Sequence, residues 1–199
     1  MTKQQIPPNT TLYPVPVVLI TCGPTTNPNI FTLNRIASCN AEPPMLAISV
    51  RPARASHDLI TQTGQFVVNI PTPDMEIITD FIGITTARFT DKWTETGLIP
   101  RPATHLDTPL IDQCPVNIEC QVEQTLSLPS HTLFIAQVLT IHADPAYLNQ
   151  HQEVDFNRAQ GGLPYRSTIV RERPVTPIKT AALRPDVHAW RDQQPTPNN

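Results

Sequence analysis

The chain has 199 residues, a formal net charge of −3 and a hydrophobic content of 39%, which together favour one domain, alone or with appendages. It has no basic run, no apolar stretch near the ~18 residues of a membrane span and no signal-peptide pattern, so we expect a cytoplasmic protein that binds neither nucleic acid nor membranes. Its four cysteines show neither CxxC pairing nor zinc-ligand spacing, so we expect reduced thiols and no metal site.

Proline is the unusual component, with 23 prolines against 6 glycines. The prolines stand between apolar runs and do not form a low-complexity tract. This distribution predicts many short elements joined by rigid turns.

The first half of the chain alternates strand-like and helix-like segments. The predicted strands are Val15–Thr21, Asn29–Ser38, Met45–Val50 and Phe66–Ile70. The second and third flank the turn Glu42-Pro43-Pro44 and should form an antiparallel pair. The predicted helices are Ser56–Thr63 with Ser56 as its N-cap, a helix from an Asp74 N-cap to about Ile82, and Asp91–Thr96 before Gly97.

The second half contains the clearest strand pattern. Apolar residues at 116, 118, 120 and 122 alternate with polar residues at 117, 119, 121 and 123, which predicts one buried and one solvated face. The connection Leu128–His131 leads to a second strand, Thr132–Ala143. From about Arg171 the sequence predicts a polar arm and a frayed tail.

Short strands with small helices in the connections predict a mainly β (α+β) barrel. These patterns do not choose among a split barrel, an oligonucleotide-binding barrel and a sandwich. The sequence also contains no GxGxxG, P-loop, HExxH or GxSxG motif, which disfavours a Rossmann nicotinamide site, a kinase-type site and a zinc hydrolase.

The strongest site signal is the group Arg51, Arg54, Ser56 and His57, where a strand gives way to a helix. Helix N-termini and arginines both favour anions, so this group predicts a phosphate clamp. The alternative is a solvated arginine beside a serine that only caps its helix.

Several motifs in order make the chain resemble the flavin reductase-like, FMN-binding split-barrel family, in particular its flavoredoxin branch. These are Ser49-Val50-Arg51-Pro52, then a serine and a helix, then Gly64-Gln65-Phe66-Val67-Val68-Asn69; Thr86-Ala87-Arg88 before Asp91-Lys92-Trp93; and Ser130-His131 before an apolar strand. The resemblance runs from about Tyr13 to Ala143 and extends at most to Tyr165. Pro129 stands where relatives have glycine, a difference that concerns the substrate pocket more than flavin binding.

The resemblance implies a split β-barrel homodimer that binds FMN, with NADH or NADPH as a possible electron donor. We expect an N-terminal arm at residues 1–12, the barrel domain at 13–170, and a C-terminal arm and polar tail at 171–199. The implied cofactor-binding residues are Asn29, Ile30, Phe31, Thr32, Ser38, Cys39, Asn40, Ser49, Val50, Arg51, Arg54, Ser56, His57 and Lys92, and the implied catalytic residue is His131.

Two of these residues have plain alternatives, since Lys92 could be an exposed lysine and His131 a turn residue. The implied activity is reduction of FMN by a nicotinamide nucleotide. One alternative function is that of a flavoredoxin-like electron carrier that acts with a redox protein partner. Another is a barrel that has lost flavin or binds a different cofactor such as heme, which the three cations Arg51, Arg54 and Lys92 argue against.

Overall fold

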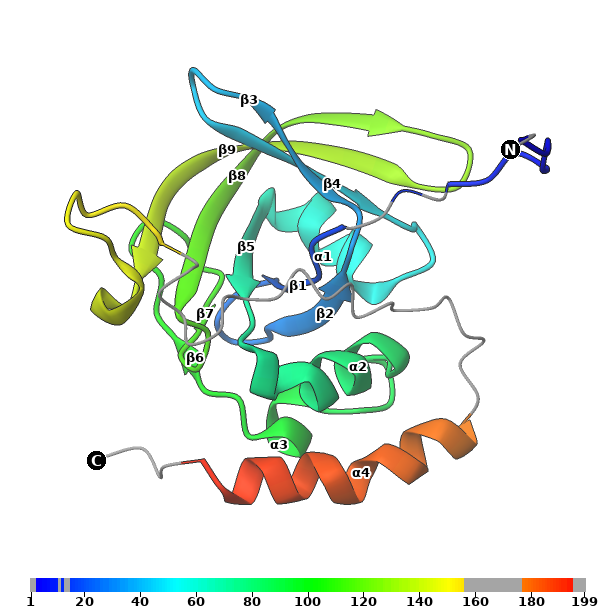
Figure 1. Ribbon diagram of the computed structural model, residues 1–199, viewed down its shortest axis with the longest axis vertical. Coiled ribbons are helices and arrows are strands. Elements are labelled where there is room, and N and C mark those ends of the chain that lie inside the picture. The colour runs from blue at the N-terminus through cyan, green and yellow to red at the C-terminus, as the bar shows by residue number, and fades with distance from the viewer. Residues whose placement is uncertain (1–2, 11, 13–14, 156–176, 195–199) are drawn as a thin grey trace.

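The structure is a computed structural model that describes residues 3–10, 12, 15–155 and 177–194 (Figure 1). Its main element is a curled sheet of seven antiparallel strands in the order β2-β1-β5-β8-β9-β4-β3. The strands are β1 Val18–Cys22, β2 Asn29–Leu33, β3 Ile36–Asn40, β4 Met45–Val50, β5 Gln65–Ile70, β8 Val116–Ser127 and β9 Thr132–Ala143. A small second sheet joins β6 Pro100–Arg101 to β7 Leu110–Ile111. The predicted mainly β architecture is confirmed.

The helices are α1 Ala55–Thr63, α2 Glu76–Ile84, α3 Lys92–Thr96 and α4 Pro177–Asp192, with short 3-10 turns at Pro73–Met75 and Pro145–Tyr147. α1 packs against the inside of the curled sheet through Ile60, whereas α2, α3 and α4 gather at one end of the sheet (Figure 1). In Figure 1, α2 lies between β2 and α4, and α3 lies beside α4. Within the described ranges, no helix combines the length and apolar character needed to cross a lipid bilayer.

Two apolar clusters hold the fold together. The first fills the inside of the curled sheet around Ile20, Phe66 and Phe134, which are at most 1% exposed. The second lies between the sheet and the helices and includes Phe81 of α2 and Val187 of α4. Because complete burial of such a side chain contributes about 1.5–3 kcal/mol, the second cluster fixes the helices on the sheet.

The predicted strand Asn29–Ser38 is in fact two strands. β2 ends at Leu33 and pairs with β1, whereas β3 starts at Ile36 and pairs with β4. β2 and β3 form opposite edges of the sheet. The chain must change partners at Asn34 and Arg35, so only β3 forms the predicted hairpin with β4. The first strand also starts later than predicted, at Val18, two residues beyond Pro16, which has no N–H to donate.

Local sequence signals predicted where the helices lie, but not all of their N-cap residues. Asp91 caps α3 by accepting hydrogen bonds from the backbone N–H groups of Trp93 and Thr94, and Gly97 ends it with a left-handed φ of 68°, as the sequence indicated. The predicted caps Ser56 and Asp74 are wrong. The N-cap of α1 is Arg54, with Ser56 inside the helix, and Asp74 lies within the 3-10 turn that precedes α2.

The predicted solvated face of β8 is also wrong at its start. Asn117 is 7% exposed and Glu119 is fully buried, because β7 covers Asn117 and the segment between β6 and β7 folds over Glu119. The Glu119 carboxylate accepts hydrogen bonds from the backbone N–H groups of Thr104 (2.7 Å) and His105 (2.8 Å) and contacts His142 Nε2 at 2.6 Å. At the start of β8, the period-two alternation therefore separates an apolar face from a polar face, and both faces are buried.

The C-terminal region contains a helix that the sequence analysis did not predict. α4 packs against α2 and α3, and its Val187 is completely buried. Arg184 and His188 of α4 contact the Glu95 carboxylate of α3 at 3.2 Å and 3.0 Å. The expected domain boundary near residue 170 lies outside the described residues, so the division of the chain remains a prediction.

Candidate functional site

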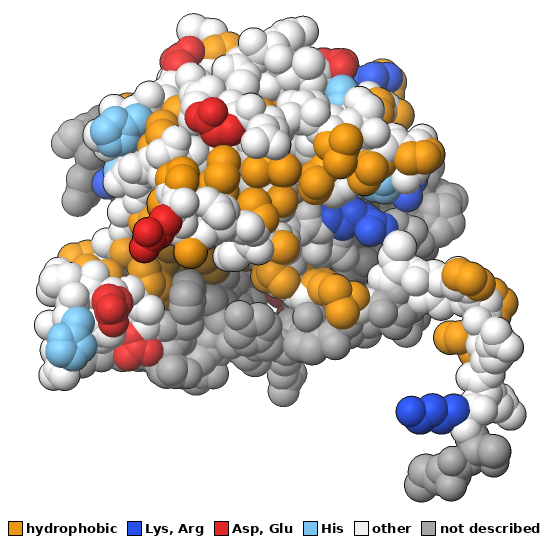
Figure 2. All heavy atoms as spheres, turned by 90° about the horizontal axis from the view of Figure 1, so that it is seen from above, with side chains coloured by type: hydrophobic (Ala, Val, Ile, Leu, Met, Phe, Trp, Pro, Cys, Tyr) orange, Lys and Arg blue, Asp and Glu red, His pale blue; other side chains and the backbone are white. Residues whose placement is uncertain are grey.

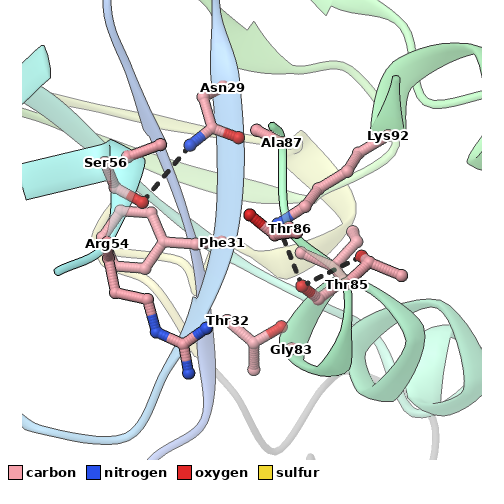
Figure 3. A pocket seen from close by; sticks show the side chains of 12 residues that line it. Asn29, Phe31, Thr32, Arg54, Ser56, Gly83, Thr85, Thr86, Ala87 and Lys92 are labelled. Atoms are coloured by element: carbon pink, nitrogen blue, oxygen red, sulfur yellow. Dashed lines mark hydrogen bonds between the residues drawn. The ribbon is translucent and has the colours of Figure 1, made fainter. Parts of the chain in front are cut away.

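A pocket opens where β2, the start of α1, the end of α2 and the start of α3 meet (Figure 3). Six residues of the predicted binding site line it: Asn29, Phe31, Thr32, Arg54, Ser56 and Lys92. They come from three segments separated by more than twenty residues each. The structure therefore brings together residues that the sequence linked only through resemblance.

β2 forms one wall of the pocket through Asn29, Phe31 and Thr32. Asn29 Nδ2 donates a hydrogen bond to Ser56 Oγ at 3.2 Å, which ties the strand to α1. On the other side, Thr32 packs against Gly83 of α2, where an added Cβ would come within 3.3 Å of the Thr32 Cβ. The absence of a side chain at Gly83 thus permits the close approach that forms this wall.

The start of α1 contributes backbone donors and a cation. Ala55 and Ser56 line the pocket, and the side chain of the N-cap residue, Arg54, makes no capping hydrogen bond. The first N–H groups of a helix have no acceptor within the helix and lie at the positive end of its dipole. With the Arg54 guanidinium at the same place, this end of α1 is suited to an anion.

Lys92 enters from the α3 side (Figure 3) and is buried, with 5% exposure. Its Nζ donates hydrogen bonds to the backbone oxygens of Ile30 (2.7 Å) and Ile82 (3.0 Å), and so joins β2 to the end of α2. Burial lowers the pKa of Lys92 to about 8; a negative charge on Cys22 would raise it, and the charge of Arg54 lowers it further. Lys92 is therefore neither the exposed lysine of the plain alternative nor a freely solvated cation.

Lys92 has no carboxylate partner within 4 Å among the described residues. The nearby Cys22 supplies no negative charge at neutral pH, because burial raises the pKa of its thiol to about 12. A buried cation without a counter-charge is costly. The pocket thus contains a positive charge that an anionic ligand would balance.

The loop that follows α2 is a part of the site that was not predicted. Thr85, Thr86 and Ala87 line the pocket together with Ile82 and Gly83. Thr85 Oγ1 donates to the Phe81 carbonyl oxygen at 2.8 Å, which closes the end of α2. A signal was present, since two adjacent threonines directly follow an apolar helix pattern and precede Arg88, within the motif that carried the resemblance.

The other predicted residues do not line this pocket. Ser38, Cys39 and Asn40 lie exposed on the β3 edge, Ile30 and Val50 direct their side chains into the core, Ser49 is half-buried on β4, and Arg51 is exposed. Ile30 contributes to the site through its carbonyl oxygen, which accepts a hydrogen bond from Lys92 Nζ. For this group the predicted roles remain predictions.

The two predicted histidines lie near the start of β9. His57 Nε2 is 2.9 Å from Thr132 Oγ1, and its ring centroid is 5.6 Å from that of Phe134, so this ring packs between α1 and the sheet. His131 is half-buried, with Nδ1 2.9 Å from Ser130 Oγ. Neither histidine lines the pocket, and a catalytic role for His131 remains a prediction.

The pocket volume, about 70 Å³, is well below the roughly 300–1,000 Å³ of sites that enclose a drug-sized ligand. A pocket of this size receives one small group, such as the phosphate end of a larger molecule. Its chemistry agrees with that size, because the helix N-terminus, Arg54 and Lys92 all favour negative charge.

Comparison with known proteins identifies relatives of this chain. The family model for the flavin reductase like domain matches residues 10–162. The flavoredoxin of Desulfovibrio vulgaris (Miyazaki F) has a similar structure, with a TM-score of 0.74 and 28% identity over 79% of this chain and 85% of that chain. An FMN reductase (NADH), RutF, of Stutzerimonas stutzeri is 24% identical over 128 residues, 63% of this chain and 69% of that protein.

A third similarity concerns the fold alone. A protein with a split barrel domain from Shewanella frigidimarina has a TM-score of 0.65 at 16% identity, over 71% of this chain and 73% of that chain. Together with the curled seven-stranded sheet, it confirms the predicted split barrel.

Proposed function

Because the chain belongs to the flavin reductase like domain family, we propose that it binds FMN and transfers electrons from NADH or NADPH to this flavin. The observation that carries the proposal is the buried Lys92, which shares a small pocket with Arg54 and the start of α1 and has no carboxylate partner among the described residues. A flavin monophosphate offers the single terminal anion that such a pocket suits.

The chemical character of the pocket residues suits this ligand. Arg54, Lys92 and the first N–H groups of α1 would hold the phosphate, while β2 offers its edge to the rest of the molecule. Bound FMN supplies the redox chemistry, since the flavin accepts hydride and releases electrons. The part played by the protein is to bind the phosphate, orient the ring and leave one face accessible to the electron donor.

We propose that the active form is a homodimer. β9 alternates completely buried Phe134 and Ala136 with half-buried Leu133 and Ile135, and Leu126 of β8, which pairs with Leu133, is 53% exposed. The outer face of the strand is thus apolar, where an antiparallel sheet that meets water is normally polar. Figure 2 views this side of the molecule and shows hydrophobic side chains across the middle of the surface.

A second copy would also explain how a small pocket can serve a large ligand. The pocket accommodates only one end of a flavin, so the ring must lie outside it. An apolar surface contributed by a second subunit would exclude water from part of that ring.

The second candidate is a flavoredoxin-like carrier that passes electrons from bound FMN to a redox protein partner. The specific support is the similarity to the flavoredoxin of Desulfovibrio vulgaris, at 28% identity and a TM-score of 0.74. We place either activity in the cytoplasm, because the four cysteines are all free and Cys39 is exposed, which suits a reducing compartment.

The experiment that tests the phosphate assignment compares Arg54, which lines the pocket, with an arginine outside the predicted site. Arg101 is exposed on β6 and does not line the pocket, so Arg101→Ala is the control for Arg54→Ala. A charge-assisted hydrogen bond contributes about 1.5–3 kcal/mol, so Arg54→Ala should weaken FMN binding by roughly tenfold or more and leave riboflavin binding within about threefold. Fluorescence titration measures both affinities. Equal losses for FMN and riboflavin would refute the assignment.

The reductase and the carrier differ in their reaction with a nicotinamide nucleotide. Anaerobic mixing with NADH or NADPH should bleach the flavin absorbance of a reductase. If His131 lines the open face of the flavin, His131→Ala should slow this step and change FMN affinity by less than about threefold, since imidazoles at loop positions often serve binding. An unchanged rate would make His131 a turn residue and favour the carrier.

A further inference from the structure

Whether Lys92 has a free N–H donor for a ligand depends on its protonation state. A lysine ammonium has three N–H donors, and two of them are given to the backbone oxygens of Ile30 and Ile82. The protonated side chain therefore keeps one N–H for a ligand. The neutral amine has two N–H bonds, both of which those carbonyl oxygens can accept, so it offers a phosphate neither a donor nor a charge.

We propose, on the basis of the proposed function, that phosphate binding in this pocket is coupled to protonation of Lys92, so that the protein loses its selectivity for phosphorylated over unphosphorylated flavin as the pH rises. A bound phosphate keeps Lys92 protonated, and protonated Lys92 holds the phosphate. By linkage, the two events favour each other by the same free energy.

At neutral pH, the charged groups close to Lys92 disfavour its protonation. Arg54 at the start of α1 disfavours a second positive charge, and Cys22 of β1 is a neutral thiol. β2 carries no titratable residue, and the acidic residues of α2, Glu76 and Asp80, precede the turn that contacts Lys92.

The other titratable groups near α3 and α1 are engaged elsewhere. Asp91 caps α3 through the N–H groups of Trp93 and Thr94, and Glu95 contacts Arg184 and His188 of α4. On α1, Asp58 is 3.5 Å from His57 Nδ1. None of these carboxylates is within 4 Å of Lys92, so a ligand phosphate would be its counter-charge in the described structure.

The size of the effect follows from the fraction of protonated Lys92 in the flavin-free protein. Since the pKa of Lys92 is about 8, this fraction falls about tenfold between pH 7 and pH 9. The ratio of FMN affinity to riboflavin affinity should fall by about the same factor. Riboflavin is the appropriate reference, because it shares the ring and the ribityl chain of FMN and lacks only the phosphate.

The test measures FMN and riboflavin affinities of the full chain at pH 7 and pH 9, for the wild type, for Lys92→Met and for Arg54→Gln. The expected result is a roughly tenfold fall in selectivity for the wild type. The fall should be smaller for Arg54→Gln, which retains Lys92 but loses the neighbouring charge that lowers its pKa. Lys92→Met should show a low selectivity that does not change with pH. Riboflavin binding by each variant reports whether its pocket is folded.

A measurement on the wild type alone keeps the proposal testable if Lys92→Met does not fold. Calorimetry at pH 8 in two buffers of different ionisation enthalpy should show uptake of about half a proton with FMN and none with riboflavin. The phosphate itself contributes little there, because its second pKa is about 6. FMN selectivity that is constant from pH 7 to pH 9, without proton uptake, would overturn this inference and leave the phosphate assignment intact. Absence of selectivity at every pH would instead refute the proposed function.

Discussion

The two edges of the seven-stranded sheet differ in what covers them. At one edge, α2 and α3 pack on β2, and α4 packs on both helices. At the other edge, four of the five β3 residues are exposed and no described helix lies over the strand. The covered edge has the pocket with its buried cation, whereas the sheet toward the uncovered edge presents apolar side chains of β9 to the surface.

This contrast shows how one sheet can provide two kinds of surface. A small polar ligand requires groups that converge from several elements, and only the helix-covered edge supplies them. A partner protein requires area, and an open apolar sheet face supplies that without any concavity. Three substitutions test whether the two regions differ in this way.

The largest expected effect comes from removing an isoleucine under the helices. Ile78 of α2 is completely buried, so Ile78→Ala should lower the free energy of unfolding by about 2–5 kcal/mol. Ile141→Ala is the matched control on β9, where the side chain is 52% exposed, and it should cost less than about 1 kcal/mol. Urea unfolding of dilute, flavin-free protein measures both. Equal costs would mean that Ile141 is covered by a part of the chain beyond the described residues.

Glu119 tests the polar connection between the sheet and the loop that carries β6 and β7. Glu119→Gln exchanges a completely buried carboxylate for an amide with one acceptor, and should cost about 2–3 kcal/mol. Glu123→Gln on the same strand is the control, because Glu123 is exposed. Unfolding by urea at pH 7 provides the comparison, and a cost equal to that of Glu123→Gln would show that the buried charge is not needed.

The same residue predicts how stability responds to acid. Burial would raise the pKa of Glu119, but hydrogen bonds from Thr104, His142 and His105 outweigh it and hold this pKa below its ordinary value of 4.5. The folded protein thus binds a proton at Glu119 less readily than the unfolded chain. The stabilisation is present above pH 4.5 and is lost as the pH falls through the lower, folded-state pKa. The stability difference between wild type and Glu119→Gln should therefore shrink in acid.

The third substitution places a charge on the proposed dimer face. Ile135 is half-buried on the outer side of β9, and Ile135→Lys should raise the dimer dissociation constant at least about thirtyfold, since a central contact of such an interface contributes about 2 kcal/mol or more. Gln150→Lys, on the exposed turn that follows the sheet, is the control. Sedimentation measures the association, and FMN retention measured in parallel shows whether the flavin depends on it. A dimer that withstands Ile135→Lys would place the interface elsewhere.

Much of this protein is encoded locally. Alternating apolar residues set the start of β8, prolines set the turns, and Asp91 with Gly97 delimits α3, because each signal acts within a few residues of the chain. The family motifs placed Asn29, Arg54, Ser56 and Lys92 in one site before the structure showed that they line one pocket.

Burial and partners were decided only by the tertiary structure. In the sequence, Lys92 resembles any lysine at a helix start. In the structure, the carbonyl oxygen of Ile30, sixty-two positions away, accepts its hydrogen bond. The alternation along β8 predicts that Glu119 is exposed to solvent, but in the structure the loop before β7 folds over it. The break at Asn34 and Arg35 exists because the sheet curls and gives β2 and β3 opposite edges. Sequence patterns report the environment of a residue along its own segment, whereas desolvation and pKa depend on which distant segments pack against it.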